Sequence, residues 1–299
     1  MNYSNIETFL TLAKTKSFTK TAETLYLSQS TISYRLKSLE DELGVKLIQR
    51  EQGKGYITLT AKGEEFIDIA NKWNSLLKDT QEWKTQNPVH KLKIGSVDSL
   101  NTCVFSKLYK KLLLNDSPII LNVSTHWTET IHKLIENYGA DIGFVLWQIP
   151  SNSIISKPLF SERMVLVSSA YSNFTDIVHP KDLNPQNEVF LYCGPNFKIW
   201  HDYWWDNAKR EYSSVDTVAL MKAFFDITDF WSIVPISIAR NLTQNNLIKI
   251  SELEESPPDR ICYEIINKYP LPKNVKSLEA FDELLNDYIK SDDFNSIIK

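Results

Sequence analysis

The sequence predicts a small, mainly helical N-terminal domain, one long helix, and an α/β domain of two lobes. Three observations predict this fold class. Apolar residues recur at helical spacing over the first 60 residues, and one apolar stripe continues to residue 87. From residue 91 onward, strand-like and helix-like segments alternate. The length of 299 residues, of which 42% are apolar, suits a globular protein of more than one domain.

Composition excludes several classes of protein. No apolar run approaches the roughly 18 residues of a membrane-spanning helix, and the N-terminus lacks a signal-peptide pattern. Only 8 residues are glycine, and no phosphate-binding glycine loop, nucleophile elbow or HExxH motif is present. We therefore expect no catalytic residue, metal, cofactor or membrane partner. The three cysteines, Cys103, Cys193 and Cys262, are far apart, which favours a reducing, cytoplasmic location and buried, inert thiols over redox sensors.

The first domain, residues 1–60, begins with helices. One helix face collects apolar residues at spacings of three and four: Ile6, Phe9, Leu10 and Ala13. Ser17 or Thr19 suits the N-cap of a second, short helix. Ser28 suits the N-cap of a third helix, which runs to about Leu43 and ends at Gly44. The sequence thus predicts a helix-turn-helix over about residues 18–37.

The outward face of the third helix carries hydroxyls, an amide and cations, with no acidic residue between Ser28 and Leu39. Such side chains suit base edges and phosphate oxygens, although an ordinary polar face is the alternative. Residues 45–50 and 56–60 predict a hairpin whose tip and base would touch phosphates, which completes a winged helix-turn-helix. The candidate DNA-binding residues are Ser28, Gln29, Ser30, Thr31, Ser33, Tyr34, Arg35, Lys37, Arg50 and Lys54.

A long run of positions also carries a resemblance to a known family: Phe9, Ala13, Phe18, Ala22, Leu25, Ser28, Gln29, Ile32, Leu36, Leu39, Leu43, Gly44, Leu47, Arg50, Leu59, Thr60 and Gly63. This run closely resembles the DNA-binding domain of the LysR-type transcriptional regulators. Thr21, Ser30 and Ile48 depart from the residues usual there, and none of them changes the expected contacts with bases. The resemblance implies a regulator of transcription that binds double-stranded DNA.

Residues 61–87 predict a linker helix with an apolar stripe. The residues that we assign to dimerisation are Phe66, Ile69, Trp73, Leu76 and Leu77. The stripe packs either on its own domain or against the same helix of a second chain, and its length favours the second. The resemblance implies the same dimer, and a symmetric dimer implies a pseudo-palindromic promoter site. A homodimer and a homotetramer both stay open, and RNA polymerase is a further possible partner.

Residues 91–299 predict an α/β domain with mainly parallel sheets. The segments 139–143 and 158–167 resemble the LysR-type effector domain, which is similar to periplasmic binding proteins. The resemblance implies lobe I at about 91–163 and 268–299, and lobe II at about 164–267. The crossing strands would lie near 163–168 and 263–268. Residues 225–231 lack the family's usual glycine pair, so we expect a different backbone in that corner.

Ligands of such folds bind at the carboxyl ends of strands, between the lobes. Hydroxyls and amides beside helix N-termini favour an anion, typically a carboxylate, although each residue also suits a simple cap or turn. The candidate effector-binding residues are Ser96, Ser99, Asn101, Thr102, Thr125, His126, Trp127, Thr128, Pro195 and Asn196. Four tryptophans in lobe II form either core packing or, less commonly, an aromatic ligand box: Trp200, Trp204, Trp205 and Trp231.

Together these features predict a sequence-specific DNA-binding transcriptional regulator whose C-terminal domain senses a small, anionic metabolite. The alternative is a metabolite-binding oligomeric protein whose head serves assembly and does not bind DNA. An enzyme with its site in the cleft is a third hypothesis, which the missing catalytic motifs disfavour.

Overall fold

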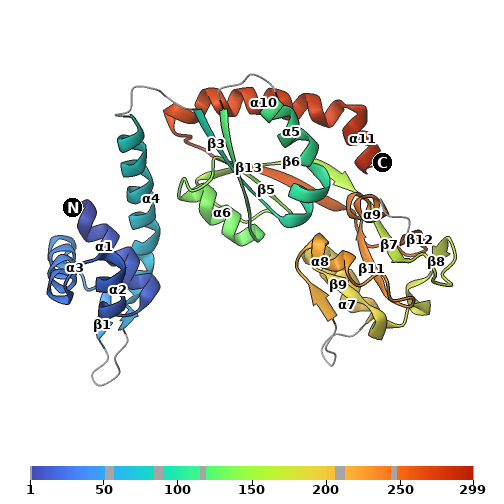
Figure 1. Ribbon diagram of the computed structural model, residues 1–299, viewed down its shortest axis with the longest axis horizontal. Helices are drawn as coiled ribbons and strands as arrows, with labels where there is room; N and C mark the ends of the chain where they lie inside the picture. Colours follow the sequence, from blue (N-terminus) through green and yellow to red (C-terminus); the bar gives the residue numbers. More distant parts are fainter. Residues whose placement is uncertain are drawn as a thin grey trace. The chain divides into compact units, whose positions relative to one another are not determined.

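The computed structural model describes residues 2–50, 57–83, 90–114, 119–205, 213–243 and 248–298. The chain forms two compact units, Met1–Pro88 and Val89–Lys299, and each unit has its own hydrophobic core (Figure 1). We refer to them as the N-terminal unit and the C-terminal unit. The division falls close to the predicted end of the long helix.

The N-terminal unit consists of α1 (Tyr3–Thr15), α2 (Phe18–Leu25), α3 (Gln29–Leu43), β1 (Ile48–Arg50), β2 (Ile57–Leu59) and α4 (Ala61–Trp83). Hydroxyl side chains cap two of these helices. Ser17 Oγ accepts the N–H of Lys20 at 3.3 Å, and Ser28 Oγ accepts the N–H of Thr31 at 3.2 Å. Gly44, with a φ of 69°, ends α3 in the left-handed conformation. These caps confirm the predicted starts of α2 and α3 and the predicted end of α3.

The core of the N-terminal unit brings α1, α3 and α4 together. Phe9 and Leu12 of α1 are fully buried, and the ring centroids of Phe9 and Phe66 lie 5.3 Å apart. Leu10 and Ala13, which the sequence analysis placed on the buried face, are only half-buried. The buried face of α1 is therefore rotated slightly, because its later turns pack toward α4 as well as α3.

The hairpin of the N-terminal unit is shorter than predicted. Its first strand begins at Ile48, and the reason is the buried carboxylate of Glu40. Glu40 Oε1 accepts the N–H groups of Leu47 and Ile48 at 2.9 and 3.2 Å, so these groups are engaged before the strand begins. Lys54 and the rest of the turn at 51–56 lie outside the described residues.

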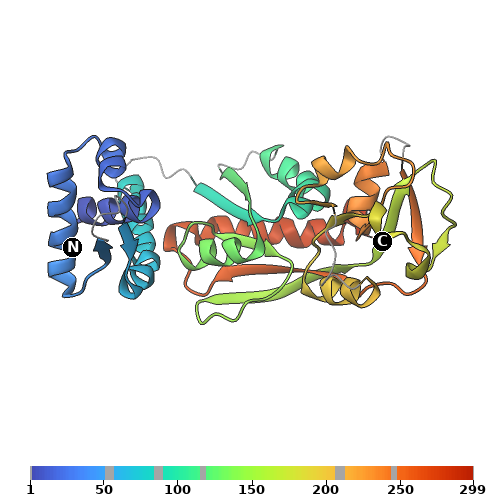
Figure 2. The ribbon, with the colours of Figure 1, turned by 90° about the horizontal axis from the view of Figure 1, so that it is seen from below.

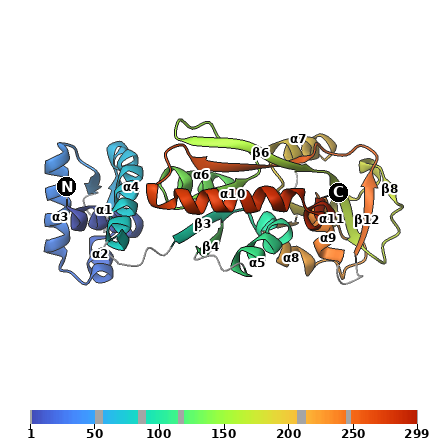
Figure 3. The same ribbon diagram turned by 90° about the horizontal axis from the view of Figure 1, so that it is seen from above.

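The C-terminal unit begins with a five-stranded mixed sheet in the order β4-β3-β5-β13-β6. Its strands are β3 (His90–Ser96), β4 (Ile119–Thr125), β5 (Ile142–Val145), β6 (Ile154–Glu162) and β13 (Arg260–Asn267). Its helices include α5 (Ser106–Leu114), α6 (Thr128–Glu136), α10 (Val275–Lys290) and α11 (Asp292–Ile298). Figure 3 shows α10 and α5 on one face of this sheet, and Figure 2 shows α6 on the other. We call this part lobe I.

Lobe II is built on a second mixed sheet in the order β11-β7-β12-β8, with a separate parallel pair, β9 and β10. Its strands are β7 (Met164–Ser169), β8 (Ile177–Val178), β9 (Val189–Leu191), β10 (Ser213–Val215), β11 (Trp231–Pro235) and β12 (Ile248–Leu253). Its helices are α7 (Pro195–Trp204), α8 (Val218–Lys222) and α9 (Ile236–Leu242), with short 3-10 turns at Pro180–Asp182 and Pro185–Asn187.

Two connections join the lobes. The chain passes from β6 into β7 at Arg163 and returns from β12 to β13 through residues 254–259. Since β13 pairs antiparallel with both β5 and β6, residues 260–267 belong to lobe I rather than to lobe II. The expected second crossing at 263–268 therefore lies too late in the chain. The sheets are mixed and not mainly parallel, because strands that enter and leave a lobe run in opposite directions.

Several elements differ from the predicted ones. The single helix expected at 101–114 is a π-helix, η1 (Leu100–Val104), followed by α5. The strand β6 and the helices α9 and α11 were not predicted. In the corner at 225–231, Trp231 is fully buried, and its indole N–H donates to the carbonyl oxygen of Asn184 at 2.9 Å. No helix among the described residues is long and apolar enough to cross a membrane.

Candidate functional site

The outward face of α3 is the first candidate site. Ile32, Leu36 and Leu39 are buried on one side of the helix. On the opposite side Ser30, Tyr34 and Lys37 are exposed, and Tyr34 is 73% exposed. A tyrosine this exposed on a rigid helix has no packing role within its own unit.

The first turn of α3 is held by a network of polar side chains. Ser28 Oγ lies 2.8 Å from the hydroxyls of both Ser30 and Thr31, in addition to its capping bond. Gln29 Nε2 donates to Thr19 Oγ1 of α2 at 2.9 Å. These bonds fix the side chains of the first turn relative to α2. Ser28 and Thr31 therefore have a structural role here whether or not they also contact DNA.

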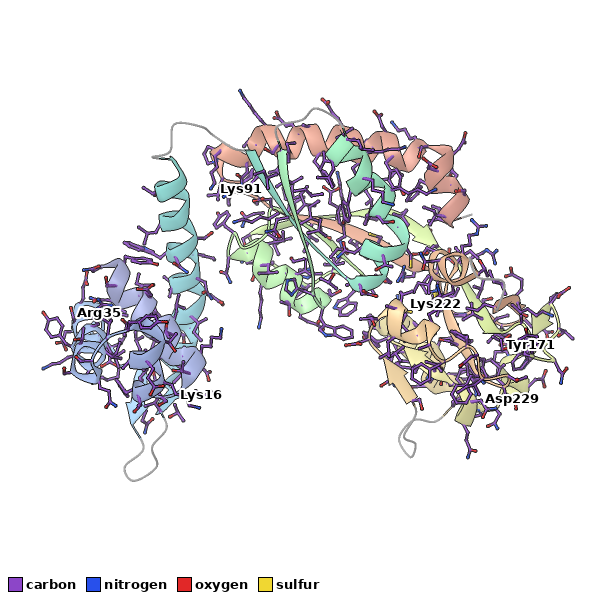
Figure 4. All side chains as sticks on the ribbon, in the orientation of Figure 1. Lys16, Arg35, Lys91, Tyr171, Lys222 and Asp229 are labelled. Atoms are coloured by element: carbon purple, nitrogen blue, oxygen red, sulfur yellow. The ribbon has the colours of Figure 1, made fainter. Side chains whose placement is uncertain are left out.

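The other candidates for DNA contact surround this face. Ser33 and Arg35 are half-buried on its two flanks, and Figure 4 labels Arg35 on α3. Arg50 ends β1, where its backbone pairs with Ile57, and Lys54 lies outside the described residues. Sequence analysis missed Tyr26, which is 94% exposed in the turn before α3, with a φ of 55°. The signal was available, since an aromatic residue in a polar turn has no core to enter.

The apolar stripe of α4 divides into two parts. Phe66 and Ala70 are buried in the core of the N-terminal unit, and Trp73 packs partly against it. Ile69 and Leu76 are 51% and 47% exposed. Phe66 is thus already buried within its own chain. The exposed apolar surface of α4 depends on Ile69 and Leu76, with Leu77 half-buried beside them.

A cavity of about 250 Å³ lies between the two lobes of the C-terminal unit. The strands β3, β4 and β5 run parallel, so the loops that follow them meet at one edge of lobe I. The loops after β9 and β10 close the cavity from lobe II. Five of the predicted effector residues line it: Ser99, Thr125, His126, Trp127 and Thr128.

The remaining candidates lie elsewhere. Ser96 is fully buried and Asn101 is half-buried, where its amide donates to Thr125 Oγ1 at 3.0 Å. Thr102 lines a different depression, on the far side of η1. Pro195 and Asn196 line a smaller cavity of about 150 Å³. This cavity and the first share Leu146 and Trp147 as a common wall.

Sequence analysis missed the two carboxylates of the main cavity. Asp98 comes from the loop after β3 and Asp216 from the loop after β10, so each lobe supplies one. Asp98 Oδ2 accepts the backbone N–H of Val218 at 2.8 Å, which joins the lobes. Among the described residues that line the cavity, none is lysine or arginine. The cavity is thus acidic, although the sequence predicted a site for an anion.

Aromatic rings form much of the remaining wall. The rings of Trp147 from lobe I and Tyr192 from lobe II meet edge to face, with centroids 5.7 Å apart. Trp127 lines the same cavity and is 52% exposed. Burial raises the pKa of the Tyr192 hydroxyl, and the carboxylate of Glu129 raises it further, against the opposite influence of Lys198.

A buried ion pair lies where the two connections cross. Arg260 and Glu162 are 4% and 2% exposed, and Arg260 Nη2 donates to Glu162 Oε1 at 2.6 Å. Arg260 Nη1 also donates to Ser99 Oγ at 2.8 Å, and Glu162 Oε2 accepts the N–H of Ser237 at the start of α9. Burial lowers the pKa of Arg260, but the attraction of Glu162 outweighs it and the net shift is upward. This pair links a residue of the cavity to a helix of lobe II.

The three cysteines are buried, free thiols. Burial raises the pKa of Cys103 and of Cys193 to about 12, despite the opposite influence of Arg260. Burial also raises the pKa of Cys262 well above its ordinary value. A thiol in this state carries little thiolate, which is the nucleophilic form. The geometry supports inert core thiols.

The tryptophans of lobe II belong to its core. Trp231 and Trp205 are buried, with ring centroids 5.4 Å apart, and Trp200 meets Trp205 edge to face at 5.7 Å. Trp204 packs partly against the same core. None of the four lines the main cavity, so the core-packing alternative holds. No group of three or more metal-ligating side chains occurs within the described ranges.

Comparison with known proteins identifies both units. A family model described as a bacterial regulatory helix-turn-helix protein of the lysR family matches residues 3–64. A second model, the LysR substrate binding domain, matches residues 85–278, which is more than half of the chain. The chain belongs to the LysR family of transcriptional regulators. It is therefore a DNA-binding regulator with an effector-binding domain, and the hypotheses of an enzyme and of a head that does not bind DNA are set aside.

Individual relatives agree with this membership. The chain is 33% identical over 165 residues to an uncharacterized HTH-type transcriptional regulator from *Staphylococcus xylosus*, over 54% of this chain and 60% of that protein. It is 26% identical over 268 residues to the HTH-type transcriptional regulator CitR of Bacillus subtilis, over 84% of this chain and 88% of CitR.

Solved structures of LysR-family regulators share the fold. CbnR covers 97% of this chain and 100% of its own at 19% identity, with a TM-score of 0.68. CbnR in complex with its target DNA gives a TM-score of 0.67 at 18% identity, over 96% of this chain and 100% of its own. OxyR from Pseudomonas aeruginosa gives a TM-score of 0.63 at 20% identity, over 98% of this chain and 96% of its own.

Proposed function

We propose that this LysR-family regulator contacts base edges through the outward face of α3. The observation that supports this is a helix face without carboxylates on its first three turns, on which Tyr34 and Lys37 are exposed. Gln29, Ser33 and Tyr34 would contact bases. Arg35, Lys37, Arg50 and Lys54 would bind phosphates, because a cation on a flexible stem follows the backbone and carries little sequence information.

Assembly through α4 is the second part of the proposal. Ile69 and Leu76 leave apolar surface exposed on a helix of 23 residues. Burying that surface against the same helix of a second copy would give a homodimer, and its two heads would bind a pseudo-palindromic promoter site. Pairs of such dimers would form a homotetramer, and the DNA-bound form could contact RNA polymerase. We place this activity in the cytoplasm, where bacterial DNA lies.

The third part of the proposal assigns the effector to the interlobe cavity. Its support is the hydrogen bond between Asp98 of lobe I and the N–H of Val218 of lobe II, at the edge of the cavity. Opening the lobes would break this bond. A ligand that touches both lobes therefore has a different free energy in open and closed arrangements, which is the condition for shifting them.

The sequence predicted a small anion as the effector, held by hydroxyls at helix ends. Ser99 is the one residue of its first loop prediction that lines the cavity, and its hydroxyl already accepts from Arg260. Thr102, expected to complete that site, lines a different depression. The support for an anion is thus weaker than the support for the cavity itself.

A footprinting experiment tests the cavity assignment. A DNA site selected with the full chain is footprinted with and without a low-molecular-weight extract of the source cells. We expect the extract to change the footprint of the wild type and to lose that effect with Trp127→Ala. Tyr171→Ala, which removes a 71% exposed aromatic residue of lobe II outside the cavity, is the matched control and should respond like the wild type. A normal response of Trp127→Ala would place the effector elsewhere.

A further inference from the structure

The main cavity has an unbalanced negative charge. Asp98 uses Oδ2 to bind the N–H of Val218, and no other described residue donates to its second oxygen, Oδ1. Asp216 is exposed, and its carboxylate accepts no hydrogen bond from the part of the chain that the structure describes. Both carboxylates belong to the wall of one cavity, and each comes from a different lobe.

Cations near the cavity are already paired with carboxylates. Lys198 of α7, whose charge acts on Tyr192, is bound by both oxygens of Asp202 at 2.6 Å. Arg260 is buried, and Glu162 neutralises it. Neither side chain lines the main cavity. An anionic ligand would therefore meet two carboxylates and no compensating lysine or arginine among the described lining residues.

The aromatic wall adds a second, independent preference. Trp127, Trp147 and Tyr192 line the same space as the two carboxylates. The face of an aromatic ring attracts a cation, most strongly for tryptophan, and an aromatic cage binds alkylated ammonium groups. Trp127 is 52% exposed, so a ligand in the cavity would also cover apolar surface that lies open without it.

We propose that the effector is a small organic cation, with an ammonium group on an apolar body, held between Asp98, Asp216 and the aromatic wall. This inference rests on the proposed function of the cavity and names the ligand class. A cation between the two carboxylates would offset their mutual repulsion and connect lobe I to lobe II, which favours closure. A bare metal ion fits less well, because no group of three metal-ligating side chains occurs among the described residues.

Three probes of matched shape test the charge. Choline carries a quaternary ammonium, 3,3-dimethylbutan-1-ol is its neutral isostere, and 3,3-dimethylbutyrate is an anion with the same apolar end. Binding of each to the full chain is measured by titration calorimetry and by ligand-observed NMR. We expect choline to bind at least about tenfold more tightly than the alcohol, and the carboxylate to bind most weakly.

Two matched variants connect the preference to the cavity. Asp216→Asn removes one charge from the wall at nearly constant shape and should reduce the preference for choline at least about fivefold. Asp229→Asn removes a charge from an exposed turn of lobe II outside the cavity, labelled in Figure 4, and should bind choline like the wild type. Thermal melting of both variants checks that the fold is retained.

Each remaining outcome has a definite meaning. Tighter binding of the carboxylate probe, abolished by Trp127→Ala, would overturn the cation proposal and keep the cavity as the effector site. Choline binding that neither Asp216→Asn nor Trp127→Ala weakens would overturn both the cation proposal and the cavity assignment. Equal affinity for all three probes, or binding of none at millimolar concentration, would overturn the cation proposal alone.

Discussion

The two candidate sites present their functional groups in opposite ways. In the N-terminal unit, one helix supplies the row Ser30, Tyr34 and Lys37, whose spacing is fixed by the helix itself. In the C-terminal unit, loops from both lobes supply the wall of one cavity, in which Asp98 and Asp216 are separated by more than a hundred residues of sequence. The first site is rigid, while the geometry of the second depends on how the lobes are arranged.

The placement of arginine shows the same difference. Arg35 of α3 lies on a flank of an outward face, where it costs little desolvation and can bind a phosphate on contact. Arg260 is buried, and its charge is used within the fold to bind Glu162 and Ser99. Identical side chains thus serve an external anion in one unit and the internal connection of two lobes in the other.

The largest effect that we predict separates the two units energetically. Arg260→Met leaves the Glu162 carboxylate buried without its cation, which should lower the free energy of unfolding of the C-terminal unit by about 3–5 kcal/mol. Hydrogen exchange measured by mass spectrometry checks this, since it resolves the units. Amides of the C-terminal unit should lose protection, whereas those of α1 to α3 should keep it.

An exposed ion pair nearby is the matched control. Arg163, which is 41% exposed, pairs with Glu252, which is 51% exposed. Arg163→Met should change the stability by no more than about 1 kcal/mol, because solvent screens an exposed pair. Equal losses in the two variants would show that burial of the Arg260 pair is not the cause.

The sequence predicted the N-terminal unit more closely than the cavity, for a physical reason. Helix caps such as Ser17 and Ser28 and the stop at Gly44 act within a few residues, so local sequence is sufficient to find them. The same holds for the hydroxyls and cations of α3, which need only a helix to share one face. Tyr26 was missed because its exposure follows from a left-handed turn that no periodicity indicates.

The cavity depends on tertiary contacts that the sequence does not reveal. Asp216 follows β10, three residues that form a strand only by pairing with β9. Arg260 stands directly after an irregular segment with two prolines, and only the antiparallel pairing of β13 with β6 places it beside Glu162. Asp98 lay within a predicted loop but was passed over, because the neighbouring hydroxyls and amides suggested an anion.

The second prediction divides the stripe of α4. Phe66→Ala should lower the stability of the N-terminal unit by about 3 kcal/mol, because it empties space in that unit's core. The double variant Ile69→Glu with Leu76→Glu should instead separate the oligomer, since assembly would bury two unpaired charges. Sedimentation velocity measures assembly, and circular dichroism melting measures stability.

A charge reversal away from the stripe controls for helix electrostatics. Lys62 is 62% exposed on the same helix, and Lys62→Glu should leave both assembly and melting close to those of the wild type. If the double variant sediments like the wild type, α4 does not form the dimer interface. If Phe66→Ala alone dissociates the oligomer without loss of stability, the division of the stripe is wrong.

The smallest effect in free energy distinguishes two kinds of contact within α3. Tyr34→Ala removes a side chain that we expect to touch a base edge, and it should cost about 1–3 kcal/mol and relax the preference at one position of the selected site. Lys37→Ala removes a phosphate contact, so it should weaken all sequences alike and reduce the salt slope of log K by about one unit. Binding-site selection with both variants, followed by titrations at several salt concentrations, measures both quantities. The two residues are three positions apart on one exposed face, so a general effect on the helix would change both profiles in the same way. Identical profiles for Tyr34→Ala and Lys37→Ala would therefore contradict the assignment of bases to one and phosphates to the other.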